Sequence, residues 1–199
     1  MRIQTTRQPE SSFLSLEKDM EIIVEHILKN GRLQKLLFDT SADPLSRGPL
    51  TAEEKRKFIK QNIKFTPKLK VDTEALNYLF ITFSHFNTNP TNPKFRDNLI
   101  VFTILCHYEQ WELAEFAHLR PYRIAAEIDT AFTNQKMTGI GTLEFTGATP
   151  FSLNEEFGGI QIIYRAIHGG EDKKPMLNEE DWDDYSKEGG EFDVIYNEE

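Results

Sequence analysis

Apolar residues at helical spacing predict three helices in the first third of the chain. The first helix follows Ser15, a residue type that caps helices, and ends before Gly31. Its apolar stripe consists of Leu16, Met20, Ile23, Val24, Ile27 and Leu28. The segment RLQKLLF predicts a second, short helix. The residues TAEE at 51–54 form a capping box, which predicts a third helix that ends near Gln61.

The pattern then changes to alternating and β-branched residues, which predict two strands. Between residues 76 and 86, Leu79, Ile81 and Phe83 share one face, and the other face is more polar. Residues 99–108 are apolar on both faces, so we expect this second strand to be central in its sheet. The connection NTNPTNPKFRDN is rich in Asn and Pro and predicts a long loop. Two consecutive strands joined by one loop indicate an antiparallel pair.

A further helix and two more strands follow. Ile124, Ile128 and Phe132 recur every four residues and predict a helix that packs on the sheet. The segments GIGTLEF at 139–145 and IQIIYRAI at 160–167 predict two strands. Helices and strands are segregated rather than alternating along the chain. We therefore predict an α+β fold: a mostly antiparallel β-sheet of about four strands with about three to four packing helices, plus extended terminal arms.

The charge distribution divides the chain. After residue 170 there are 12 acidic and 3 basic residues, and before it there are 20 of each sign, so the whole net charge of −9 lies at the C-terminal end. We predict a flexible N-terminal arm at residues 1–12, a single α+β domain at 13–168 and an acidic C-terminal arm at 169–199.

The sequence offers little for catalysis. Its five histidines have neither H-x-x-x-H nor Cys/His ligand spacing. The single cysteine, Cys106, lies in an apolar run, which excludes an internal disulfide and fits a reducing compartment. The pair Gly139 and Gly141 lacks the third glycine of a dinucleotide-binding fingerprint. We predict a protein that is not an enzyme, with no catalytic residues, no metal site and no cofactor.

A basic strip lies between residues 53 and 70, where seven cations face only two acids. Its members are Lys55, Arg56, Lys57, Lys60, Lys64, Lys68 and Lys70. Three interpretations stay open: a solvated helix face and loop, a path for a polyanion, or a surface that receives the acidic arm of another copy. We predict an interface role for these residues.

The acidic arm also carries apolar residues among its carboxylates. The candidate anchors are Trp182, Tyr185, Phe192, Ile195 and Tyr196. This pattern is typical of a segment that folds only on contact with a partner, and the alternative is a solvated tail.

Five segments of the chain resemble a known group of proteins: RLQKLLF, NPKFRDNLIVFTILCHYEQWEL, LRPYRIAAEIDTAF, MTGIGTLEF and NEEFGGIQIIYRAIHGGED. Across residues 20–172 the sequence is similar to neck and tail-completion proteins of tailed bacteriophages, which include tail terminators and head-to-tail adaptors. The resemblance implies a structural virion protein that forms a ring of six or twelve copies around the DNA channel. The implied neighbours are portal, adaptor, tail-tube or sheath proteins.

This resemblance gives the leading functional hypothesis: a ring protein made in the host bacterial cytoplasm and located in the neck or tail of the virion. DNA then passes through the ring without sequence-specific binding, and no membrane is involved. A second hypothesis is a regulatory binding module whose acidic arm engages a basic partner surface. A third, a small hydrolase or nuclease, would depend on His107, His168 or Glu109.

Overall fold

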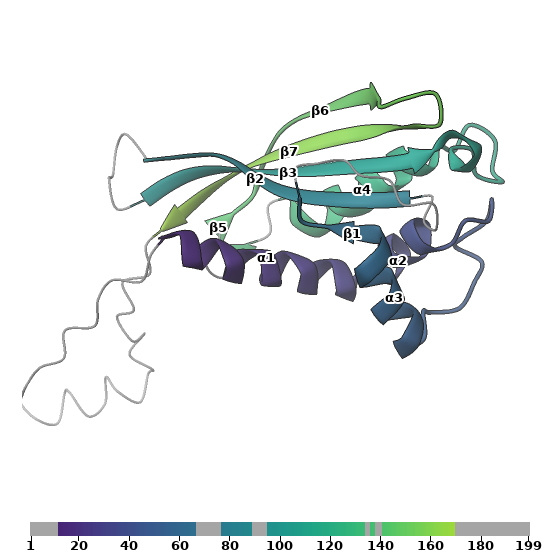
Figure 1. Ribbon diagram of the computed structural model, residues 1–199, viewed down its shortest axis with the longest axis horizontal. Helices are drawn as coiled ribbons and strands as arrows, with labels where there is room; N and C mark the ends of the chain where they lie inside the picture. Colours follow the sequence, from purple (N-terminus) through teal and green to yellow (C-terminus); the bar gives the residue numbers. More distant parts are fainter. Residues whose placement is uncertain (1–11, 67–76, 89–94, 134–135, 138–140, 170–199) are drawn as a thin grey trace, which may run out of the picture.

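A computed structural model describes residues 12–66, 77–88, 95–133, 136–137 and 141–169 of the chain (Figure 1). Three helices come first, and the sheet and a fourth helix follow. The elements are α1 Ser12–Lys29, α2 Gly31–Phe38, α3 Ala52–Asn62, β1 Ile63–Lys64, β2 Asn77–Thr88, β3 Phe95–His107, the 3-10 helix η1 Tyr108–Gln110, α4 Arg120–Phe132, β4 Lys136–Met137, β5 Gly141–Thr142, β6 Glu144–Ser152 and β7 Phe157–Gly169.

The main sheet has five strands in the order β1-β2-β3-β7-β6. Only β1 runs parallel to its neighbour, and the other pairs are antiparallel. The antiparallel pairing of β2 with β3 and the central place of β3 confirm the sequence predictions. The short strands β4 and β5 pair separately. The α+β fold class is confirmed, and the main sheet has one short strand more than predicted.

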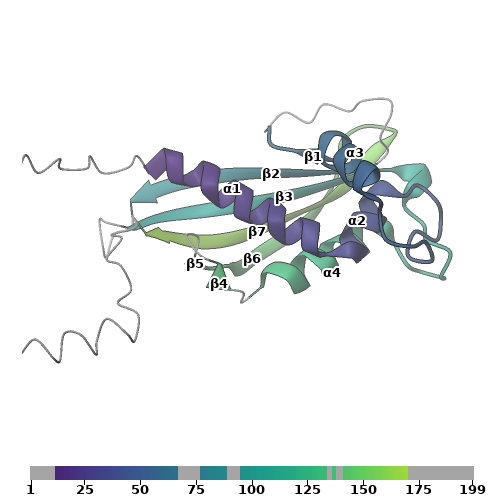
Figure 2. The same cartoon turned by 90° about the horizontal axis from the view of Figure 1, so that it is seen from below.

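All four α-helices pack on one face of the sheet, and α1 crosses that face in Figure 2. Alternate residues of the strands point toward them, because successive side chains on a strand face opposite sides. The ring of Phe102 on β3 lies 5.0 Å from that of Phe132 on α4 and 5.8 Å from that of Tyr164 on β7. Ile124 and Ile128 of α4 are fully buried in the same core, as their spacing predicts.

The helix boundaries partly differ from the prediction. The first helix ends at Lys29, before Gly31 as predicted, but a second helix begins at Gly31 at once, and Ser15 lies inside α1 rather than at its cap. The reason is Asn30, whose side-chain oxygen accepts hydrogen bonds from the backbone N–H groups of Arg32 and Leu33 at 3.1 and 3.0 Å and so caps α2.

The predicted capping box of the third helix is confirmed. Thr51 Oγ1 accepts from the backbone N–H of Glu54 at 3.3 Å, and the Glu54 carboxylate accepts from the backbone N–H of Thr51 at 2.8 Å. The helix ends at Asn62, one residue beyond the predicted end.

The strand prediction at 139–145 is wrong in its boundaries. Residues 138–140 lie outside the described residues, Gly141–Thr142 forms β5, and the long strand β6 begins at Glu144. Strand β6 contains Pro150, and it tolerates this proline because it is the edge of the sheet. The predicted strand at 160–167 is confirmed and extends further in both directions. The predicted terminal arms fall mostly outside the described residues, at 1–11 and 170–199.

Candidate functional site

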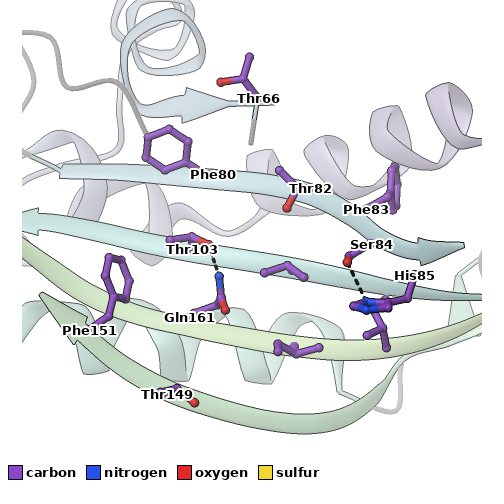
Figure 3. A pocket seen from close by; sticks show the side chains of 13 residues that line it. Thr66, Phe80, Thr82, Phe83, Ser84, His85, Thr103, Thr149, Phe151 and Gln161 are labelled. Carbon is purple, nitrogen blue, oxygen red and sulfur yellow. Dashed lines mark hydrogen bonds between the residues drawn. The ribbon is translucent and has the colours of Figure 1, made fainter. Parts of the chain in front are cut away.

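The face of the sheet opposite the helices holds an open groove of about 520 Å³ (Figure 3). None of the described α-helices covers it. Its lining comes from β2, β3, β6 and β7 and from Thr66 after β1. The lining residues are Thr66, Phe80, Thr82, Phe83, Ser84, His85, Leu99, Val101, Thr103, Thr149, Phe151, Gln161 and Ile163.

One end of the groove meets a small aromatic core on the same face of the sheet. Phe80 and Phe151 belong to both. The Tyr78 ring lies 6.1 Å from that of Phe80 and 6.3 Å from that of Phe157. These interlocking rings hold the apolar wall of the groove in place.

Four of the polar side chains of the groove form two pairs. Gln161 Nε2 donates to Thr103 Oγ1 at 3.1 Å, and Ser84 Oγ lies 2.8 Å from His85 Nδ1. His85 has a φ of 53°, and it lies where the β2–β3 register shifts between Ser84 and Asn87. Such a bulge redirects a side chain, here toward the groove (Figure 3).

The Ser84–His85 contact is the nearest arrangement to a nucleophile and its base in this groove. Such a pair also needs an acid that orients the base. The residues that line the groove include no carboxylate. Among the described residues, no cluster of three or more His, Cys, Asp or Glu side chains is placed to hold a metal ion. The lining of the groove, apolar side chains with hydroxyl and amide groups among them, is suited to receive an apolar or hydroxyl-bearing group.

The structure places the described part of the basic strip along α3 and β1. Lys55, Arg56, Lys57 and Lys60 are exposed, whereas Lys64 is half-buried. Lys64 Nζ donates to the backbone carbonyl of Lys60 at 3.0 Å, which ties β1 to the last turn of α3. Lys68 and Lys70 lie outside the described residues, as do the arm residues Trp182, Tyr185, Phe192, Ile195 and Tyr196. The interface role of all these residues stays a prediction.

Lys64 also connects the strip to the groove. In the parallel pair of β1 and β2, Lys64 lies opposite Phe80, and Ile63 lies opposite Leu79. Residues opposite one another share a face of the sheet. Leu79 is buried in the helix-side core, so Lys64 lies with Phe80 on the face that carries the groove.

The sequence analysis missed a second exposed feature, the tip loop formed by residues 112–119. Phe116 at its tip is 98% exposed, far more than any other large apolar residue that the structure describes. In the sequence, Phe116 is simply an apolar residue outside the helical stripe of α4. Such a residue can lie at a loop tip or in the core, so the sequence did not indicate its exposure.

Arg120 anchors the base of this loop. It is fully buried, and its guanidinium donates to four backbone carbonyls from α2, the segment after α2 and η1. Its own backbone N–H donates to the carbonyl of Trp111 at 2.7 Å. Burial lowers the pKa of Arg120, and the neighbouring Cys106 and Asp39 oppose that shift. An arginine nevertheless stays charged in proteins, so the carbonyl dipoles replace its lost hydration.

Two further findings concern reactivity and membranes. Cys106 is fully buried, and burial raises the pKa of its thiol to about 12, which makes it a poor nucleophile. No helix among the described residues has the length and apolar character needed to cross a membrane.

Comparison with known proteins gives one informative match. No curated protein matches the chain. A crystal structure of a protein from Akkermansia muciniphila shares 13% identity over 80% of this chain and 96% of that chain, but its TM-score of 0.27 is too low to support a conclusion. The family model YomW matches residues 30–166, which include α2 to α4 and nearly all of the main sheet. The chain therefore belongs to the YomW family, named after a phage-derived Bacillus gene, and is a phage-related protein.

Proposed function

We propose that this protein is a structural component of a phage virion, a subunit that forms a ring at the head–tail junction or at the tail terminus. The observation that carries the proposal is the one-sided packing of the sheet in a protein of a phage-related family. Helices cover one face, and the other face keeps a groove together with the exposed edge strand β6. Such surfaces are suited to contacts between copies and with adjoining rings.

The separation of charge supports a role in assembly. The exposed cations of α3 form a positive surface, and the whole net charge of −9 lies after residue 170. A ring subunit needs two different surfaces that fit each other, because it contacts one neighbour on each side. In the proposed ring the acidic arm contacts the basic strip of the next copy or of an adjoining ring.

In this proposal the ring has six or twelve copies and surrounds the DNA channel. Its neighbours are portal, adaptor, tail-tube or sheath proteins, and it contacts passing DNA without reading its sequence. The protein is made in the bacterial cytoplasm and is incorporated into the neck or tail of the virion.

The test is the oligomeric state of the full chain. We expect native mass spectrometry and negative-stain electron microscopy to reveal a closed ring, alone or with adjoining neck proteins. A monomer under both conditions would refute the proposal. Lys57→Glu with Lys60→Glu should weaken assembly in a salt-dependent manner, because both side chains are exposed on α3. Lys29→Glu, an exposed charge reversal on α1, is the matched control and should leave the ring intact.

The charge separation also favours a second function, a regulatory module whose acidic arm engages a basic partner. Deletion of residues 171–199 distinguishes the two. For a regulatory module, the truncated protein folds and keeps its oligomeric state but loses its partner. For the ring proposal, the truncated protein assembles more weakly with itself or with neighbouring rings.

A further inference from the structure

The tip loop presents an aromatic side chain to solvent in a defined backbone conformation. Phe116 is 98% exposed, and the next residue, Ala117, has a φ of 61°. A left-handed conformation is unfavourable at a residue other than glycine, because Cβ then crowds the backbone. Such a cost persists where the surrounding structure holds the backbone in place.

Hydrogen bonds along the loop supply that support. Residues 112 and 119 form an isolated antiparallel bridge, and Leu113 N–H donates to the carbonyl of His118 at 2.9 Å. Ala114 N–H donates to the carbonyl of Ala42 at 2.8 Å, which ties the loop to the segment after α2.

Side chains hold the other side of the loop. His118 contacts the Glu115 carboxylate, and Arg123 of α4 lies 3.1 Å from His118 Nδ1. The loop is thus ordered before any partner arrives, so little conformational entropy remains to be lost when Phe116 becomes buried.

The groove on the open sheet face is the complementary surface. It is large enough for an aromatic side chain, and apolar residues from four strands line it, among them Leu99, Val101 and Ile163. These three side chains are only half-buried in the isolated chain. Phe116 is almost fully exposed, so it does not fill the groove of its own molecule.

The charges of the two surfaces are opposite. Two exposed carboxylates, Glu112 and Glu115, flank Phe116 in the tip loop. Lys64 of β1 lies opposite Phe80 and so belongs to the groove side of the sheet. When Phe116 enters the groove, the acidic residues of the tip loop face Lys64, and this complementarity favours one orientation of docking.

We propose that Phe116 of one copy inserts into the sheet-face groove of a second copy. The two surfaces differ, so the contact is head-to-tail, and repetition produces a ring when the rotation between copies closes. This inference rests on the proposed ring function and names the contact between neighbouring subunits.

Two single variants and their mixture test the contact. Phe116→Ala removes the inserted ring, and Thr149→Glu places a negative charge at an exposed position of the groove wall. Each alone should weaken self-association at least ~30-fold, the effect expected of a central aromatic anchor. An equimolar mixture should form 1:1 dimers and nothing larger, because one intact groove then meets one intact tip loop. Sedimentation velocity measures all three samples.

Further variants test whether the loss of association comes from the groove itself and not from a loss of folding. Thr82→Glu blocks the opposite wall of the groove and should behave like Thr149→Glu. Phe145→Ala is the matched control, because Phe145 is 52% exposed but packs against Tyr164 on the helix side. It should leave assembly unchanged, and circular dichroism should show that every variant is folded.

The outcomes separate this inference from the ring proposal. If the wild type forms a ring and Phe116→Ala still forms it, the tip-loop contact is wrong and the ring proposal stands. The same holds if both variants are monomeric and their mixture forms no dimer. A wild-type protein that stays monomeric alone and with neck proteins would overturn both. Loss of binding to another protein with no change in self-association would assign Phe116 to a different partner.

Discussion

Replacement of Arg120 tests how the tip loop is held on the domain. Its Nε donates to the carbonyl of Gln110 at 2.7 Å, and Nη1 donates to the carbonyls of Leu36 and Asp39 at 2.8 and 2.6 Å. Nη2 donates to the carbonyl of Ser41. A single side chain thus joins the C-terminal end of α2, the segment that follows it, and η1.

The expected loss follows from these contacts. A hydrogen bond to a charged group contributes ~1.5–3 kcal/mol, and a buried carbonyl left without a donor costs ~1–3 kcal/mol. The four bonds share one side chain and are not additive, and water enters part of the space that an alanine leaves. We therefore expect Arg120→Ala to lower the free energy of unfolding by ~3–5 kcal/mol, less than the sum of four such bonds and their unpaired carbonyls.

Two further substitutions separate hydrogen bonding from packing. Arg120→Met restores most of the volume without donors, and Arg120→Lys keeps a charge with fewer donors in a different geometry. We expect the stability order wild type, then Lys, then Met and Ala. Arg32→Ala is the control, because the Arg32 side chain is 60% exposed and its pair with Glu127 contributes at most ~1 kcal/mol.

Urea unfolding followed by tryptophan fluorescence is the assay. Trp111 is a suitable reporter, because its indole N–H donates to the carbonyl of Cys106 at 3.2 Å and its own carbonyl accepts from Arg120. If Arg120→Met unfolds within ~0.5 kcal/mol of wild type, a change typical of surface substitutions, the guanidinium bonds do not stabilise this region and the argument fails.

Three other predictions test the sheet, the cysteine and the arm. Gly159→Ala should prevent stable folding, because a Cβ there would lie 1.7 Å from a carbonyl oxygen of β3; Gly147→Ala, with open space around it, should fold normally by circular dichroism. Burial raises the pKa of Cys106 from 9.0 to about 12, so above pH 9 the thiol loses its proton more readily in the unfolded chain than in the folded one. The free energy of unfolding should therefore be unaffected by this thiol below pH 9 and fall as the pH rises toward 12. The difference between wild type and Cys106→Ala in pH-dependent unfolding measures that loss, and equal slopes would contradict it. Trp182→Ala with Tyr185→Ala should weaken assembly with little change in Tm, whereas a large drop in Tm would mean that the arm packs on its own domain.

Local features of the sequence were sufficient for most of the helices and for the centre of the sheet. The capping box at Thr51 and the stripe of Ile124, Ile128 and Phe132 depend on residues within a few positions of one another. Helix start and helical periodicity are local properties, so they can be recognised without a fold. The sequence did not separate the start of the second helix at Gly31, which the Asn30 cap fixes, and it misplaced the strand boundary near Glu144.

The two surfaces proposed to meet in the ring came only from the tertiary structure. The groove exists because the strand register brings Phe80, Val101 and Gln161, which are distant in sequence, onto one face that no described helix covers. The exposure of Phe116 depends on bonds from the tip loop to distant segments, such as the buried contacts of Arg120. Sequence alone determined the α+β class, the helical periodicities and the concentration of charge at the C-terminal end. Pairing register and solvent exposure are non-local, so only the folded chain decided where its candidate binding surfaces lie.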